Sequence, residues 1–235
     1  MSTISAAQSS LHLYEEIMLL ALREDNGKIE SKARFEYSTL LAAALLSELV
    51  LLERIAIQNK KKMIVEVTSR EPVECDLLDE ALSTISDSKP KPATHWVTKL
   101  QRIKNLQARA AQSLCDKGIL KAEDGKVLFF FDRTYYPELN PMPEQEVISR
   151  LQSVIFGNDT DIDERTLVLL ALLRKSELLK IPFEAKALKN QRHRMKEICE
   201  GDLIGEAAQK TVEAAQAAMM VAVIIPAVTT TVITN

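Results

Sequence analysis

The sequence has few of the residues that form turns. Its 235 residues include only 6 glycines and 8 prolines, about half the usual combined share. Architectures that need a tight turn after every short strand, such as sandwiches and propellers, are therefore disfavoured. Aromatic residues are also scarce, at 5% of the chain, whereas Leu, Ala, Glu and Lys dominate many stretches. These residues favour helices, so the composition predicts a mainly α-helical fold.

Cysteines and long apolar runs are limited as well. Cys75, Cys115 and Cys199 lie far apart and lack metal-ligand spacing, which is typical of a reducing compartment. The longest apolar run, residues 217–228, contains Pro226 and is shorter than the ~20 residues of a membrane span. No leader of basic, apolar and small residues opens the chain. We therefore expect a cytoplasmic protein that at most lies on a membrane surface.

Positive charge is not in excess. The 30 Lys and Arg against 33 Asp and Glu leave a net charge of −3, so any anionic partner must be met by a local patch. One helical pattern carries Lys99, Arg102 and Arg109, with Lys104 to one side. A later one carries Lys186, Lys189, His193 and Lys196, flanked by Arg192 and Arg194. Each is either a solvated helix side or an anion site.

Hydrophobic periodicity places most of the chain in helices. Residues 1–10 are expected to be a disordered tail, and residues 11–235 a single helical domain. The helix over 31–52 is apolar nearly all round between 40 and 46, which indicates a helix buried by others. The other predicted helices cover residues 11–24, 76–85, 96–114, 144–156, 165–179, 183–199 and 206–223.

Two short β segments interrupt the helices. Met63, Val65 and Val67 are apolar residues at every second position and predict one strand. Farther along, Asp124-Gly125 is a two-residue turn signal, so we predict a hairpin with strands over 119–123 and 126–131. A strand apolar on both faces has to be covered by a partner as well as by its own core. We therefore expect homo-oligomerisation through five residues of the second strand: Val127, Leu128, Phe129, Phe130 and Phe131.

No catalytic motif is present in the sequence. It lacks a phosphate-binding loop, a dinucleotide-binding glycine motif and the zinc-protease and serine-hydrolase motifs. His12, His95 and His193 are isolated, so we predict that they are structural or solvent-facing. Of the adjacent Glu15 and Glu16, we expect one to face a partner in the core rather than to serve in acid–base catalysis. The interpretation is a protein that is not an enzyme and needs no metal or cofactor.

A helix that runs into a hairpin also suggests a winged-helix DNA-binding module. Against this hypothesis, the predicted wing carries Phe where a DNA-facing wing carries Lys or Arg, and the chain is net acidic. No nucleic-acid partner is expected.

Several segments occur in an order that resembles the Golgi phosphoprotein 3 family. They are LHLYEEIMLLALREDNGKI, LLSELVLLERI, MIVEVTS, DLLDEAL, RAAQSLCDKGIL with its hairpin, and DERTLVLLALL. The resemblance covers roughly residues 11–225, and the segment MKEICEGDLIGEAAQKTVEAAQAA looks closer to the prokaryotic branch. It implies a hydrophobic central helix bundle ringed by amphipathic helices, with a projecting β-hairpin for self-association. The implied function is a peripheral protein that binds phosphatidylinositol 4-phosphate and the cytosolic tails of membrane proteins.

The resemblance also implies where the lipid would bind. The family's Trp and Arg positions correspond to Ala33 and Ala42, and its basic pair to Lys104 and Gln107. Because Lys104 keeps the charge, we expect the anionic head group near it. Three other cations are expected to assist if folding brings them close: Arg102, Lys32 and Arg34. The uncharged residues favour a second hypothesis, a soluble protein-interaction module that has lost the lipid site, and both hypotheses stay open at this point.

Overall fold

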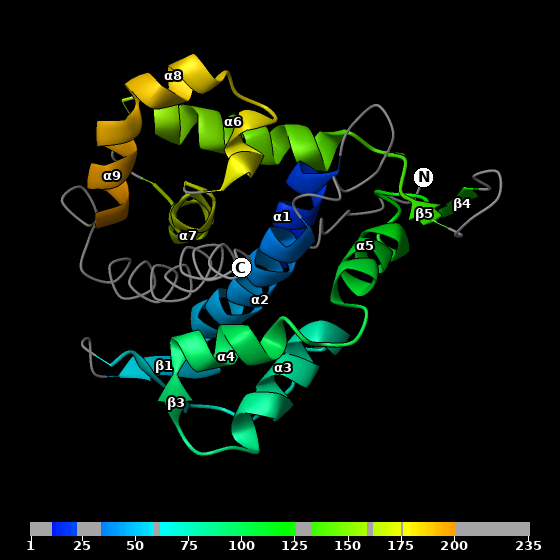
Figure 1. Ribbon diagram of the computed structural model, residues 1–235, viewed down its shortest axis with the longest axis vertical. Helices are drawn as coiled ribbons and strands as arrows, with labels where there is room; N and C mark the ends of the chain where they lie inside the picture. Colours follow the sequence, from blue (N-terminus) through cyan, green and yellow to red (C-terminus); the bar gives the residue numbers. More distant parts are fainter. Residues whose placement is uncertain are drawn as a thin grey trace, which may run out of the picture.

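A computed structural model describes residues 11–22, 34–58, 62–125, 133–158, 162–174 and 176–200. The described part of the chain is mainly helical, which confirms the predicted fold class (Figure 1). The predicted tail over 1–10 and the predicted helix over 206–223 lie outside it. In chain order the elements are α1 (Leu13–Ala21), α2 (Arg34–Leu51), β1 (Ile55–Gln58), β2 (Ile64–Val67), α3 (Asp76–Ser86), β3 (Lys91–Pro92), α4 (Ala93–Leu100), α5 (Leu106–Asp116), β4 (Glu123–Gly125), β5 (Arg133–Tyr135), α6 (Met142–Phe156), α7 (Glu164–Leu173), the 3-10 helix η2 (Glu177–Lys180), α8 (Ala185–Asn190) and α9 (Arg192–Glu200).

Helix α2 lies at the centre because its apolar residues cover all its sides. Every residue from 40 to 49 is at most 1% exposed. The helix contacts α1, α3, α4, α5, α7 and β1, and Figure 1 shows it crossing the middle of the molecule. Helix α7 is buried in the same way, over residues 166–173. The predicted hydrophobic centre is therefore confirmed.

Amphipathic helices surround this centre. Helix α3 buries residues that recur every three to four positions: Leu77, Leu78, Ala81, Leu82 and Ile85. Helix α4 does the same through Ala93, Trp96, Val97 and Leu100. This spacing places each apolar set on one face, and that face packs inward while the charged face meets solvent.

The predicted strand belongs to a small sheet. Strand β2 pairs antiparallel with β1 on one side and with β3 on the other. Sequence analysis missed both neighbours. The residues of β1 directly follow the apolar end of α2, and β3 is a two-residue strand inside a Lys- and Pro-rich segment. Neither segment is long enough for an alternation of apolar and polar residues to be recognised in the sequence.

The predicted long helix over 96–114 is wrong, because the chain divides there into α4 and α5. Asn105 has a φ of 56°, a left-handed conformation that Asn tolerates better than most residues. The apolar spacing of Leu100, Ile103 and Leu106 continues through the break, so periodicity does not reveal it. Gly118, with a φ of 69°, follows the end of α5 as expected.

Two later helices are also divided. The helix predicted over 165–179 ends at Leu173 and is followed by η2, and the one predicted over 183–199 is separate helices α8 and α9. Gln191 lies between α8 and α9 outside helical geometry, with φ −92° and ψ 7°. The chain therefore turns at both places while its apolar residues still face the core.

The hairpin projects from the body of the molecule (Figure 1), but its predicted turn is wrong. Asp124 and Gly125 are paired strand residues, opposite Thr134 and Arg133. The same register already exists at the base of the hairpin, where Leu120 pairs with Glu138. Pairing of the two chain segments there therefore outweighs the local turn signal. Strands β4 and β5 are joined by residues 126–132, and the predicted oligomerisation residues Val127–Phe131 lie in that segment, outside the described residues.

Candidate functional site

Two of the predicted lipid-binding cations lie in the connection between α4 and α5. Arg102 and Lys104 are both exposed there, next to the left-handed Asn105. Lys99 is exposed in the last turn of α4. Its Nζ lies 5.3 Å from the centre of the buried Trp96 ring, within range of a cation–π contact. This region, which we call the 99–104 connection, therefore presents three cations at the surface.

The 99–104 connection is fixed to the N-terminal half of α2. Thr39 Oγ1 donates to Gln101 Oε1 at 2.9 Å, and Gln107 Nε2 donates to Ser38 Oγ at 3.0 Å. Arg34 begins α2 one helical turn before Ser38, while Lys32 lies outside the described residues. Folding therefore brings Arg102 and Lys104 to the end of α2 on which Arg34 stands.

The spacing of Lys99, Arg102 and Arg109 predicts that they share one face of a single helix, and this prediction is wrong because Lys99 lies in α4, Arg102 after it and Arg109 in α5. The break at residues 101–105 rotates α5 relative to α4. Arg109 forms an ion pair with Glu80 of α3 and so holds two helices together.

A buried ionic cluster fixes α1 to the centre of the molecule. Its core is Glu48 of α2, whose carboxylate is 0% exposed. Arg165 donates to both Glu48 oxygens, at 2.9 and 2.7 Å. The Leu13 amide donates at 2.8 Å, and His12 Nδ1 lies 3.2 Å away. Two cations and one backbone donor therefore satisfy one buried carboxylate, as a charge removed from water requires.

The pKa values of this cluster follow from its contacts. Burial alone would raise the pKa of Glu48, but hydrogen bonds from His12 and Arg165 outweigh it and lower the pKa to about 2. Burial would lower the pKa of His12, but hydrogen bonds with Cys75 and Glu48 and the Glu48 charge raise it to about 9. Both groups are therefore charged at neutral pH.

Glu15 and Glu16 point to different sides of α1, each toward its own cation. Glu15 Oε2 accepts from Lys117 Nζ of α5 at 2.5 Å, and Glu16 pairs with Arg150 of α6. Burial raises the pKa of Glu16 to about 6, an effect that Arg150 only partly offsets. A core partner was expected for one of the two residues, whereas both have one, and the pairs join α5 and α6 to α1.

The second predicted basic stripe is divided by the break at Gln191. Four of its members, Lys189, Arg192, His193 and Lys196, line one cavity between η2, α8 and α9. Arg194 points elsewhere, because its Nε donates to the Val154 carbonyl of α6 at 3.0 Å. Lys186 is exposed on α8 and does not line the cavity.

Within the described ranges, no three His, Cys, Asp or Glu side chains gather as metal ligands. The same part of the chain contains no helix that combines the length and the apolar character needed to cross a membrane.

The sequence matches a known protein family over most of its length. The family model for Golgi phosphoprotein 3 (GPP34) matches residues 13–215. The chain belongs to the Golgi phosphoprotein 3 family. It is 25% identical over 174 residues to Vacuolar protein sorting-associated protein 74 of Eremothecium gossypii, a match that covers 66% of this chain and 52% of the relative. The chain therefore spans about half the length of that curated relative.

The positions that the resemblance assigned to the Golgi phosphoprotein 3 lipid site differ in environment. Ala42 is 0% exposed inside α2, and Gln107 is hydrogen-bonded to Ser38. Lys104 is exposed, and Ala33 lies outside the described residues. In this family member, Arg102 and Lys99 are the described cations that accompany Lys104 on the connection.

Sequence analysis missed the Glu48–Arg165 pair, although a signal was present. Glu48 stands in the mostly apolar segment LLSELVLL, and Arg165 stands at the start of the mostly apolar run in DERTLVLLALL. Charged residues are rarely buried unless they are paired, so one acid and one base in two buried family segments indicate a mutual contact.

Proposed function

We propose that this Golgi phosphoprotein 3 family member is a cytoplasmic, peripheral membrane protein that binds an anionic phospholipid head group at the 99–104 connection. The observation that carries the proposal is the exposure of Arg102 and Lys104 beside Lys99, on a loop fixed to α2. Lipid phosphates accept charge-assisted hydrogen bonds from such cations. Phosphatidylinositol 4-phosphate, which the family resemblance implies, is the first lipid to test.

Replacing both Arg102 and Lys104 by Ala is expected to weaken vesicle binding roughly thirtyfold. Each cation near an anionic leaflet contributes about 1 kcal/mol, so Lys104→Ala alone is expected to weaken binding about fivefold. Flotation with phosphatidylcholine vesicles, with and without phosphatidylinositol 4-phosphate, measures the effect.

Lys186→Ala is the matched control for these variants. It removes an equally exposed Lys from α8, away from the connection, and is expected to leave flotation unchanged. Wild-type protein that floats equally with neutral and anionic vesicles would remove the lipid proposal. Full binding by the double variant would place the lipid site elsewhere.

The second candidate function is a soluble protein-interaction module, which could include binding to cytosolic tails of membrane proteins. It is favoured by the buried Ala42 and the hydrogen-bonded Gln107, which supply no charge to a phosphate. Under this alternative, wild-type protein stays unbound in flotation, and its protein partners remain attached when detergent removes lipid.

Self-association through the projecting hairpin is the second part of the proposal. The segment leaving β5 carries two large apolar side chains in water, Leu139 at 60% and Met142 at 64% exposed. Together with the apolar residues predicted between the strands, they support an interface between copies at this end of the molecule.

Phe130→Asp is expected to convert the oligomer to a monomer, because it places a charge in the proposed apolar interface. Size-exclusion chromatography with light scattering measures the mass in solution. Ile181→Asp is the control, since Ile181 is 47% exposed beside η2, away from the hairpin, and should leave the mass unchanged. A monomeric wild type would refute the proposed self-association.

A further inference from the structure

The cavity between η2, α8 and α9 is strongly basic. It has a volume of about 1060 Å³, at the upper end for small-molecule sites. Among the described residues, its lining contains one carboxylate, Glu177, against five side chains that are cationic at neutral pH: Arg174, Lys180, Lys189, Arg192 and Lys196. With His193 neutral, 5 − 1 leaves +4 on the lining. That excess contrasts with the net charge of −3 for the whole chain.

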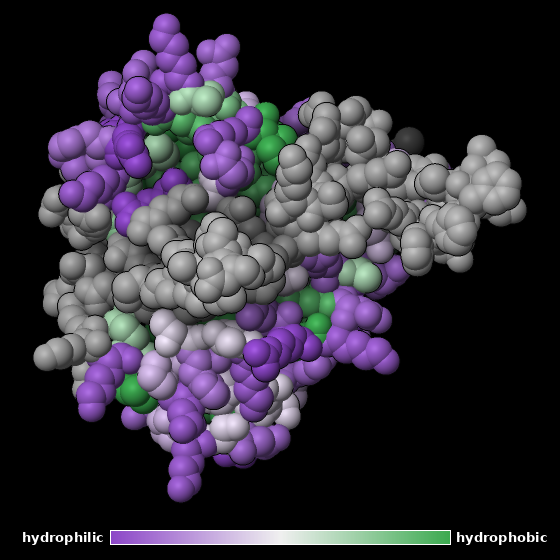
Figure 2. Space-filling model, in the orientation of Figure 1, coloured by the Kyte–Doolittle hydropathy of each residue, from purple (hydrophilic) through white to green (hydrophobic). Residues whose placement is uncertain are grey.

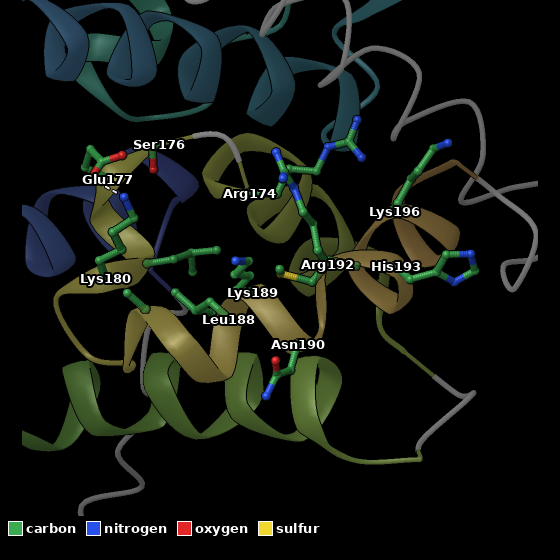
Figure 3. A pocket seen from close by; sticks show the side chains of 13 residues that line it. Arg174, Ser176, Glu177, Lys180, Leu188, Lys189, Asn190, Arg192, His193 and Lys196 are labelled. Atoms are coloured by element: carbon green, nitrogen blue, oxygen red, sulfur yellow. Dashed lines mark hydrogen bonds and ion pairs between the residues drawn. The ribbon is translucent and has the colours of Figure 1, made fainter.

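Carboxylates lie at both ends of the cavity, since Glu177 pairs with Lys180 and Glu197 Oε2 lies 3.2 Å from His193 Nδ1. Lys180 Nζ lies 2.6 Å from Glu177 Oε2. Figure 3 shows this pair at one end, His193 and Lys196 at the other, and Lys189 and Arg192 between them. Within the described residues, neither Lys189 nor Arg192 forms an ion pair with a carboxylate. The middle of the cavity therefore gathers like charges, which repel one another until an anion enters.

Local structure explains why these cations converge. The turn at Gln191 ends α8 and starts α9. It brings Lys189, in the last turn of α8, next to Arg192, in the first turn of α9. The apolar residues Leu179, Leu188 and Met195 also line the cavity, and each is at most 8% exposed. The cavity thus combines cations with an apolar floor.

We propose that this cavity binds a small organic molecule that carries at least one phosphate group. Arg192 presents a planar set of donors that matches a phosphate, and Lys189 adds a compact charge beside it. One phosphate group carries a charge of about −2, which matches Lys189 and Arg192, the two lining cations without an ion pair within the described residues. The organic part packs against Leu179, Leu188 and Met195. Soluble polyphosphates and phosphoinositide head groups share this chemistry.

Calorimetric titration of the full chain with inositol trisphosphate tests the site. We expect saturable binding that weakens at least about tenfold when Lys189 and Arg192 are both replaced by Ala, since each supplies charge-assisted hydrogen bonds. Lys186→Ala is the matched control, because it removes an exposed Lys of the same helix that does not line the cavity. It should change the affinity less than about twofold, and all variants should melt at the wild-type temperature.

Three outcomes would overturn the proposal: no saturable binding of inositol trisphosphate, full binding by the double variant, or an equal loss with Lys186→Ala. Two outcomes support it and identify the source of the phosphates. If the double variant also stops binding vesicles that contain phosphatidylinositol bisphosphate, the ligand is a lipid head group. If the double variant loses binding of inositol trisphosphate but still binds these vesicles, the ligand is a free metabolite. Arg102→Ala with Lys104→Ala should retain cavity binding, which separates this site from the 99–104 connection.

Discussion

Arg165→Ala is expected to lower the free energy of unfolding by about 3–5 kcal/mol, because it leaves a buried carboxylate without its main partner. Glu48 is 0% exposed, and Arg165 contacts both of its oxygens. His12 remains nearby but touches only one oxygen. Since α2 is the central helix, an unpaired charge there weakens the packing of α1 and α7 as well. Urea unfolding followed by circular dichroism measures the loss.

Arg109→Ala is the matched control. Its ion pair with Glu80 also joins two helices, but the two side chains are 34% and 43% exposed. Water solvates the partner that remains, so the expected loss is below about 1 kcal/mol. The double variant Glu48→Gln with Arg165→Met should be more stable than Arg165→Ala, because it leaves no unpaired carboxylate at position 48. Equal losses of unfolding free energy for Arg165→Ala and Arg109→Ala would show that the buried Glu48–Arg165 pair matters no more for stability than the exposed pair.

Stability is expected to fall as the pH rises from about 6.5 to about 9, by an amount on the order of 2 kcal/mol. The pKa of His12 is about 9 in the folded protein against 6.5 as its ordinary value, so the folded state holds this proton more tightly. The stabilisation that His12 contributes to the folded state is therefore fully present below pH 6.5 and is lost as the pH passes 9. The pH dependence of stability that comes from Glu48 has the opposite sign, because the pKa of Glu48 is lowered to about 2. Its contribution is lost only as the pH falls from 4.5 toward 2.

His12→Asn isolates the alkaline part of this dependence. An Asn amide can replace the Nδ1 donor to Glu48 and suits the start of a helix, but it does not titrate. Urea unfolding at a series of pH values should show a smaller alkaline slope in the variant than in the wild type. Parallel slopes would mean that His12 is not charged in the folded state.

Sequence patterns predicted elements whose cause is local. The apolar run of α2, the alternation of Met63, Val65 and Val67, and the end of α5 before Gly118 all follow from spacing or backbone preference within a few residues. A core partner was expected for one of the adjacent residues Glu15 and Glu16, because adjacent helical positions point to different sides, but the structure pairs both with cations. Their partners Lys117 and Arg150 lie about 100 residues or more away and could not be read from the chain.

Positions along the chain could not predict where the helices break. Apolar spacing is continuous through Asn105 and Gln191, yet both residues leave helical geometry. The hairpin register likewise depends on pairing at residues 119–121 and 137–139, which outweighs the Asp124-Gly125 turn signal. The helix breaks and the hairpin register are therefore determined by packing against the rest of the molecule.

The amino-acid sequence alone determined the mainly helical class, the all-apolar central helix and the resemblance to the Golgi phosphoprotein 3 family, because each depends on composition and short-range order. Only the tertiary structure decided which charges meet. It separated Arg109 from Arg102 and Lys104, joined Glu48 to Arg165, and gathered Lys189 and Arg192 in one cavity. Charged contacts act over a few ångströms in space, and that distance is set by turns and helix packing rather than by separation along the chain.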